Sequence, residues 1–235
     1  MIRQLTCTLR LDDGELRAYV ARPDRSDAPA VVVLHEVFGV NATMRACCDV
    51  LAAHGYLAVC PDLFWRIEPG LALDHRVPDD LRRAGELYAA FDVALGVRDI
   101  VASIDAIRRE TLGGAGVGVL GYCLGGLLAY LTATQSAVDA AVAYYGVGIE
   151  NHLGAAAELR SPLMLHIAEE DRFVPKSAQA RIEAALAPDA RVVIHRYAGR
   201  EHAFARLGGA HFHGDDAALA EARTLTFLAA LLRKP

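Results

Sequence analysis

The sequence predicts an α/β protein with a mostly parallel sheet of about seven to eight strands and helices on both faces, formed by residues 1–235 as a single domain. Short and almost wholly apolar runs, such as Ala30-Val-Val-Val-Leu-His35, are typical of strands buried on both faces of a sheet. Segments with helical periodicity alternate with these runs, which indicates parallel strands joined by helical crossovers. With 54% hydrophobic and 23% charged residues the chain can bury a large core, so disorder is excluded.

The first half of the chain is expected to begin with an antiparallel hairpin, because the turn sequence Asp12-Asp13-Gly14 separates two extended segments. Asn41 or Thr43 can cap a helix that runs to about His54, and Gly55 stands where that helix should stop. The polar, proline-containing residues 66–79 predict an irregular loop. The expected strands of this half are residues 2–10, 15–22, 30–35 and 56–60, and its later helices are residues 80–91 and 97–109.

The second half contains an uncharged segment, residues 111–138, that is long enough to span a bilayer. Repeated glycines interrupt it, and Thr132, Thr134 and Gln135 follow, so a buried strand, a tight turn and a buried helix explain it better. The strands expected here are residues 117–120, 140–145, 163–167 and 191–197, and the helices are residues 124–134, 176–187 and 216–232.

Charge and cysteine content exclude several classes of function. The chain has 24 basic and 29 acidic residues, a net charge of −5, and no stretch collects one sign, which argues against nucleic-acid and membrane partners. Its five cysteines form no C-x-x-C pair, which argues against a disulfide framework and a zinc site. The N-terminus lacks an apolar stretch of signal-peptide length, so we expect a cytoplasmic protein, and we further expect it to be a monomer.

In sheets of this kind the active site lies at the carboxyl ends of the strands. One such end carries Gly121-Tyr-Cys123-Leu-Gly125, the nucleophile-elbow pattern with cysteine in place of serine. Composition alone predicts roughly 0.04 occurrences of G-x-C-x-G in a chain like this, so the pattern is specific. The alternative is a glycine-rich helix start that holds a structural cysteine. The other cysteines, Cys7, Cys47, Cys48 and Cys60, are explained by core packing.

A thiol nucleophile needs a base and an acid that orients the base, in the chain order nucleophile, acid, histidine. Glu169, Glu170 and Asp171 follow one later strand, and of these Asp171 is favoured because it precedes the turn into the next helix. His202 follows the next strand, although a loop histidine without catalytic role is the alternative. His211 and His213 lack a third ligand at suitable spacing, so no metal site is predicted.

The loop 35–39, His-Glu-Val-Phe-Gly, is expected to supply one oxyanion donor through the Val37 N–H, with the Leu124 N–H as the other. Glu36 is unusual because a carboxylate at the end of a buried strand is costly unless it is paired. The two readings for Glu36 are a chemical role and a structural pairing with an arginine.

Six segments together resemble the dienelactone hydrolase family, the cysteine branch of the α/β-hydrolase fold, over nearly the whole chain. They are His35-Glu-Val-Phe-Gly39, Cys60-Pro-Asp-Leu63, Gly121-Tyr-Cys-Leu-Gly-Gly126, Tyr144-Tyr-Gly-Val-Gly148, Asp171-Arg-Phe-Val-Pro175 and Glu201-His-Ala-Phe-Ala-Arg206. The resemblance is close to the carboxymethylenebutenolidase type. It implies a triad of Cys123, Asp171 and His202, with Val37 and Leu124 as the oxyanion hole.

The resemblance also implies that Glu36 keeps the resting thiol neutral and takes its proton once a substrate carboxylate shifts it. An idle thiolate invites oxidation, so such triggering fits the chemistry. Of the two arginines with which the family binds the substrate carboxylate, Arg206 matches one directly. The further substrate-binding candidates are Arg82, Phe38 and Tyr145.

The sequence departs from the family pattern at the second arginine. Leu81 stands at that position, Gly85 where a tyrosine is usual, and Ala203 where a serine is common. Arg82 or Arg83 could replace the arginine, but neighbouring helical positions point about 100° apart, so replacement is not automatic.

Three functions follow as hypotheses. The first is a cofactor-free and metal-free hydrolase that opens a dienelactone (4-carboxymethylenebut-2-en-4-olide) or a related carboxylate-bearing enol lactone. The second, motivated by the missing arginine and tyrosine, is a broader carboxylesterase. The third is a non-catalytic carboxylate-binding or thiol-sensing protein that keeps the fold.

Overall fold

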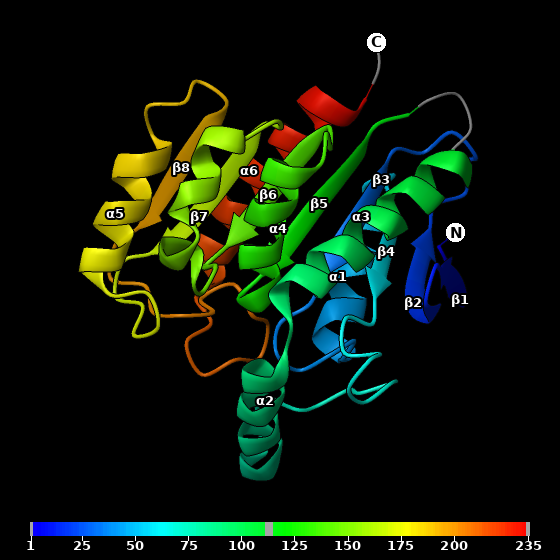
Figure 1. Cartoon of the computed structure of the whole chain (residues 1–235), viewed down its shortest axis with the longest axis horizontal. Coiled ribbons are helices and arrows are strands. Elements are labelled where there is room, and N and C mark those ends of the chain that lie inside the picture. Colours follow the sequence, from blue (N-terminus) through cyan, green and yellow to red (C-terminus); the bar gives the residue numbers. More distant parts are fainter. Residues whose placement is uncertain (1, 111–114, 234–235) are drawn as a thin grey trace.

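The computed structural model of the protein describes residues 2–110 and 115–233. In this part of the chain eight strands form one sheet, in the spatial order β1-β2-β4-β3-β5-β6-β7-β8 (Figure 1). The first hairpin pairs antiparallel, β2 pairs antiparallel with β4, and the remaining pairs are parallel. The strands are β1 (Arg3–Leu11), β2 (Gly14–Arg22), β3 (Ala30–Leu34), β4 (Leu57–Pro61), β5 (Val117–Tyr122), β6 (Ala140–Tyr144), β7 (Leu163–Ala168) and β8 (Val192–Tyr197).

Helices cover both faces of this sheet, which confirms the predicted fold class (Figure 1). Helix α4 packs on β3, β5 and β6 with α3 beside it, whereas α1 packs on β2 to β4 and α6 on β5 to β7. The helices are α1 (Ala42–Ala53), α2 (Pro78–Ala90), α3 (Val93–Glu110), α4 (Leu124–Gln135), α5 (Lys176–Leu186) and α6 (Gly214–Leu232), with short 3₁₀ helices at Ile149–Asn151 and Leu153–Glu158.

Strand β3 contributes side chains to the two hydrophobic cores that lie on opposite faces of the sheet. Its side chains alternate between the sheet faces because successive residues of a strand point in opposite directions. Val32 and Leu34 belong to the core beneath α3 and α4, whereas Val31 and Val33 belong to the core beneath α1 and α6. A strand buried on both sides therefore needs an unbroken apolar run, as the sequence analysis assumed.

Most element boundaries agree with the sequence predictions, with three differences. Helix α3 begins at Val93 and not near residue 97, because the Asp92 carboxylate accepts a hydrogen bond from the Leu95 N–H at 3.0 Å and caps the helix. Strand β5 continues to Tyr122, and α6 already begins at Gly214. Residues 111–114, the start of the uncharged segment, lie outside the described residues. None of the described helices is long and apolar enough to cross a membrane.

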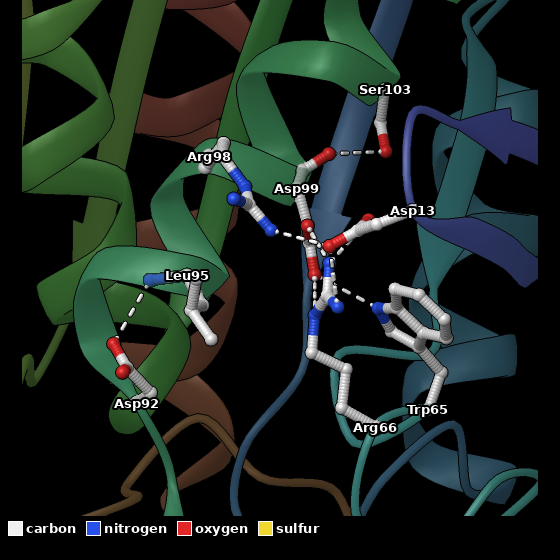
Figure 2. A network of polar contacts seen from close by, with 8 residues as sticks. All are labelled: Asp13, Trp65, Arg66, Asp92, Leu95, Arg98, Asp99 and Ser103. Atoms are coloured by element: carbon white, nitrogen blue, oxygen red, sulfur yellow. Dashed lines mark hydrogen bonds and ion pairs between the residues drawn. The ribbon is translucent and has the colours of Figure 1, made fainter.

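A network of ion pairs around the buried Asp99 ties the tip of the β1–β2 hairpin to α3 (Figure 2). The Arg66 guanidinium donates to both carboxylate oxygens of Asp99, at 2.8 and 3.0 Å, and the Trp65 indole N–H donates to Asp99 at 2.8 Å. Arg66 and Arg98 both donate to the Asp13 carboxylate, at 2.9 and 2.7 Å. The network thus joins the hairpin turn, the segment after β4 and the first turns of α3.

Because the Asp99 side chain is only 4% exposed, its removal should destabilise the protein strongly. Asp99→Ala leaves the Trp65 N–H without its acceptor and leaves the Arg66 guanidinium with the more exposed Asp13 as its remaining partner. Breaking such a buried pair typically costs about 3 kcal/mol. Urea unfolding should show this loss. Asp27→Ala, which removes an exposed partner of Arg25, is the control and should leave the midpoint nearly unchanged. Equal midpoints for the two variants would contradict a stabilising role of the network.

Candidate active site

The nucleophile-elbow segment forms the predicted strand, turn and helix. Cys123 lies between β5 and α4, with φ 54° and ψ −113°. A Cβ on Gly121 would overlap the carbonyl oxygen of Gly125, and one on Gly125 would overlap the carbonyl oxygen of Leu34. Glycine is therefore required at both positions if the turn is to be this tight and α4 is to start against the end of β3.

Backbone strain gathers around this cysteine. In the described residues, the non-glycine residues with positive φ are Cys123 (54°), Tyr145 (38°) and Ala203 (64°). Tyr145 packs edge-on against the imidazole of His202, with ring centroids 5.0 Å apart, and Ala203 directly follows that histidine. Such conformations cost about 1–3 kcal/mol each and cluster at active sites, where surrounding structure holds them.

The predicted acid and base are hydrogen-bonded. His202 Nδ1 lies 2.7 Å from Asp171 Oδ2, while Asp171 Oδ1 accepts from the Phe173 N–H at 2.8 Å. Both side chains are buried, at 7% and 2% exposure. His202 Nε2 has no hydrogen-bond partner within residues 2–110 and 115–233. The bond to Asp171 leaves Nε2 as the nitrogen available for proton transfer.

The charges of Cys123 and Asp171 affect the pKa of His202. Burial alone would lower the pKa of the imidazole, but the facing Cys123 sulfur and the bonded Asp171 carboxylate outweigh it and raise that pKa to about 10. An imidazolium held in this way is the partner that a thiolate nucleophile needs. Cys123, Asp171 and His202 thus come together from the ends of β5, β7 and β8, although 31 positions separate the acid from the histidine.

The predicted oxyanion donors lie beside the elbow. Leu124 is the first residue of α4, so its N–H has no acceptor within the helix. Val37 lies in the turn directly after β3, whose end contacts the start of α4. His35 braces this turn, because its Nε2 accepts from the Leu63 N–H at 3.0 Å and its Nδ1 bonds the Glu36 carbonyl.

Glu36 is paired with Arg206. The guanidinium donates to both carboxylate oxygens, at 2.7 and 2.8 Å, and the Glu36 side chain is only 2% exposed. Arg206 also lies over the Phe38 ring, 5.1 Å from its centroid. Burial raises the pKa of the Tyr145 hydroxyl, and the nearby Glu36 and Cys123 add to this shift. The structure therefore brings Glu36, Arg206, Phe38 and Tyr145 together next to the cysteine.

The structure does not bring Arg82 to the site. Its side chain is 66% exposed and pairs with Glu86 at 2.7 Å on its own helix, and Arg83 pairs with Glu68 at 2.6 Å and with Glu86 at 2.8 Å. Helix α2, which carries both arginines, stands out from the body of the molecule (Figure 1). Both candidates to replace the family's second arginine are therefore already paired with carboxylates of the protein.

The sequence analysis missed three residues at the site. The exposed Phe173 packs edge-on against His202, at 4.8 Å between centroids. Tyr88 lies close enough to Cys123 for the cysteine to add to the burial that raises the pKa of its hydroxyl. Gln179, which is 1% exposed, donates to the carbonyls of residues 168, 169 and 174 and so braces the loop that carries Asp171. Only Phe173, two positions after the acid, stood in a segment that the sequence singled out.

Three further histidines have structural partners. His166 is buried between the Tyr197 hydroxyl at 2.8 Å and the Thr224 hydroxyl at 3.0 Å, and His213 caps α6. His211 pairs with Glu201 at 3.3 Å. No group of three or more potential metal ligands occurs in the described part of the chain.

Known proteins resemble this chain in sequence and in fold. The model of the dienelactone hydrolase family matches residues 16–232. The carboxymethylenebutenolidases of Pseudomonas putida and Pseudomonas knackmussii are each 41% identical over 223 residues, which cover 95% of this chain and 94% of theirs. A dienelactone hydrolase-like promiscuous phosphotriesterase from metagenomic libraries has the same fold, with a TM-score of 0.82, 18% identity and 99% of both chains covered. The chain belongs to the dienelactone hydrolase family, as the sequence resemblance predicted.

Proposed function

We propose that this protein is a cofactor-free hydrolase that opens dienelactone (4-carboxymethylenebut-2-en-4-olide) or a related carboxylate-bearing enol lactone. The observation that supports this best is a strained Cys123 facing a buried His202, whose other nitrogen is bonded to Asp171. The two similar Pseudomonas proteins are carboxymethylenebutenolidases, and this relationship also supports the proposed lactone substrate.

In the proposed acylation step, Cys123 Sγ attacks the lactone carbonyl as a thiolate. The carbonyl oxygen becomes an oxyanion that accepts hydrogen bonds from the Val37 and Leu124 N–H groups. When this intermediate collapses, the ring C–O bond breaks and the enolate oxygen leaves. His202 gives its proton to the leaving group, and a thioester on Cys123 remains.

Deacylation uses the same groups in reverse roles. Neutral His202, oriented by Asp171, takes a proton from water, and the resulting hydroxide attacks the thioester carbonyl. The carbon–sulfur bond breaks, the carboxylic acid product leaves, and Cys123 returns as a thiolate beside the His202 imidazolium.

Glu36 and Arg206 are proposed to act before acylation. Each holds the other in the free enzyme, so a substrate carboxylate that binds Arg206 must replace Glu36 there. A cavity of about 290 Å³ borders both side chains and leaves room for this exchange. Once Glu36 is displaced, Arg206 holds the substrate carboxylate and thereby orients the lactone carbonyl toward the Cys123 thiolate.

The second candidate is a broader carboxylesterase, favoured by Leu81 and Gly85 on α2, where the family has an arginine and a tyrosine. The test compares kcat/KM for dienelactone with kcat/KM for neutral p-nitrophenyl esters, in the wild type and in Arg206→Ala. Our proposal predicts a strong preference for the anionic lactone that Arg206→Ala removes. A wild type that prefers the neutral esters would favour the carboxylesterase.

The raised pKa of His202 predicts a wide pH range of activity. The imidazolium must survive to protonate the leaving group, and with a pKa of about 10 it does so until the solution is strongly basic. We expect kcat/KM to fall only as the pH passes about 10. In Asp171→Asn the carboxylate no longer stabilises the imidazolium, so this fall should move to lower pH. A fall at the same pH in both proteins would contradict the role of the Asp171 charge.

A further inference from the structure

The arginines at the active-site edge of the sheet differ in whether a protein carboxylate already occupies them. Arg206 is held by Glu36, Arg82 by Glu86, and Arg83 by Glu68. Arg76 is held by Asp74 at 2.7 Å and Arg200 by Asp216 at 3.1 Å. An arginine bound in this way must first lose its partner before it can bind an anionic substrate.

Arg172 is different, although three acidic residues precede it directly in the sequence. Glu169 pairs with Arg196 at 2.9 Å, Glu170 with Lys176 at 2.7 Å, and Asp171 with His202 at 2.7 Å. None of the three carboxylates is thus paired with Arg172. Within the described residues the exposed Arg172 side chain stacks on Phe173 but has neither a hydrogen bond nor an ion pair.

The Arg172 guanidinium is nevertheless held in place beside the catalytic histidine. It lies over the Phe173 ring, 4.8 Å from its centroid, and that ring packs against His202 at 4.8 Å between centroids. Phe173 therefore contacts both the Arg172 guanidinium and the His202 imidazole and links the two. Stacking on an aromatic face restrains a guanidinium and leaves its N–H edge free for a planar acceptor.

Arg172 and Arg206 lie near different neighbours of His202, and this position determines which anions Arg172 can bind. The His202 imidazole contacts Phe173, which carries the Arg172 stack, and also Tyr145, which lies near Arg206 and Glu36. Phe173 is 48% exposed and so offers an apolar surface next to the cation. The Arg172 guanidinium and the Phe173 ring together suit a flat organic group that ends in a carboxylate. Such a group would extend from the reacting carbonyl past His202 and lie on Phe173.

We propose that Arg172 and Phe173 form a subsite for an anionic substrate group, with a carboxylate as the ligand and an unsaturated or aromatic carbon frame lying on Phe173. This subsite supplies a cation that the structure leaves unpaired, in place of the arginine that Leu81 replaces on α2. It rests on the proposed hydrolase function and narrows the substrate class to esters or lactones whose carboxylate lies away from the scissile bond.

The test uses two esters that differ only in charge, 4-acetoxyphenylacetate and the neutral 4-acetoxyphenylacetamide. Arg172→Gln should raise KM for the anion about tenfold, with kcat little changed, and should leave both constants for the amide unaltered. Arg160→Gln removes the same charge from an exposed arginine before β7, at the opposite edge of the sheet, and should change neither substrate. The effect on the anion should shrink at high salt.

Binding provides a readout that does not need turnover. Titration with 4-hydroxyphenylacetate, followed by NMR at the Phe173 backbone amide, should give a Kd about tenfold higher in Arg172→Gln than in wild type or Arg160→Gln. An unchanged Kd together with an unchanged ratio of kcat/KM for the two esters would overturn the subsite. Failure of the proposed function would look different, because wild type would then hydrolyse neither ester in a Cys123-dependent way.

Discussion

Cys123→Ala is expected to lower kcat for lactone and ester hydrolysis by about 10⁴-fold or more, because removal of the nucleophile from a triad leaves only binding and oxyanion stabilisation. The elbow places this residue where no neighbouring side chain can take over its role, since glycine is required at 121 and 125. Steady-state rates with a p-nitrophenyl ester and with dienelactone measure the loss. Residual activity should be the same whether or not the sample is treated with a thiol reagent.

Cys47→Ala is the matched control. Its thiol bonds the Tyr122 hydroxyl at 3.3 Å, and burial raises the pKa of Cys47 to about 12, so it is not a thiolate at neutral pH. We expect this variant to retain wild-type kcat. Comparable losses in the two variants would show that cysteine content, and not the nucleophile at 123, governs the rate.

His202→Ala should lower kcat about 10³-fold, because it removes the group that protonates the leaving oxygen and activates water. The expected loss is larger than that of Asp171→Asn, since the acid acts through the imidazole. His195→Ala is the control, because His195 lies on β8 and stacks on His166, away from Cys123. Circular dichroism should show that both variants fold. A His202→Ala enzyme with near wild-type kcat would remove His202 from the reaction.

The fold and the triad could be predicted from the sequence because both depend on local patterns. An unbroken apolar run marks a strand buried on both faces, and the glycines around Cys123 mark a turn too tight for side chains. The position of each site segment directly after a strand then indicated that Asp171 and His202 would meet the cysteine. The start of α3 was wrong by four residues because Asp92, which caps it, did not stand out among the acids.

Pairings between distant residues could not be predicted. Glu36 and Arg206 are 170 positions apart, and nothing local in either segment indicates that they hold each other. The same applies to Arg83, which pairs with Glu68, 15 positions away, whereas the Arg82–Glu86 pair is an i,i+4 contact within one helix. Arg172 presents the opposite case, because three preceding acids suggest a neutralised turn, whereas each of those acids is bonded elsewhere.

The most direct test of the account is intact-protein mass spectrometry of a quenched reaction between His202→Ala and p-nitrophenyl acetate, since this variant should deacylate slowly. The account predicts one added acetyl group per chain, located by peptide mapping on Cys123, and no addition in the double variant Cys123→Ala/His202→Ala. An acetyl group on any other residue, or turnover without a thioester on Cys123, would contradict it.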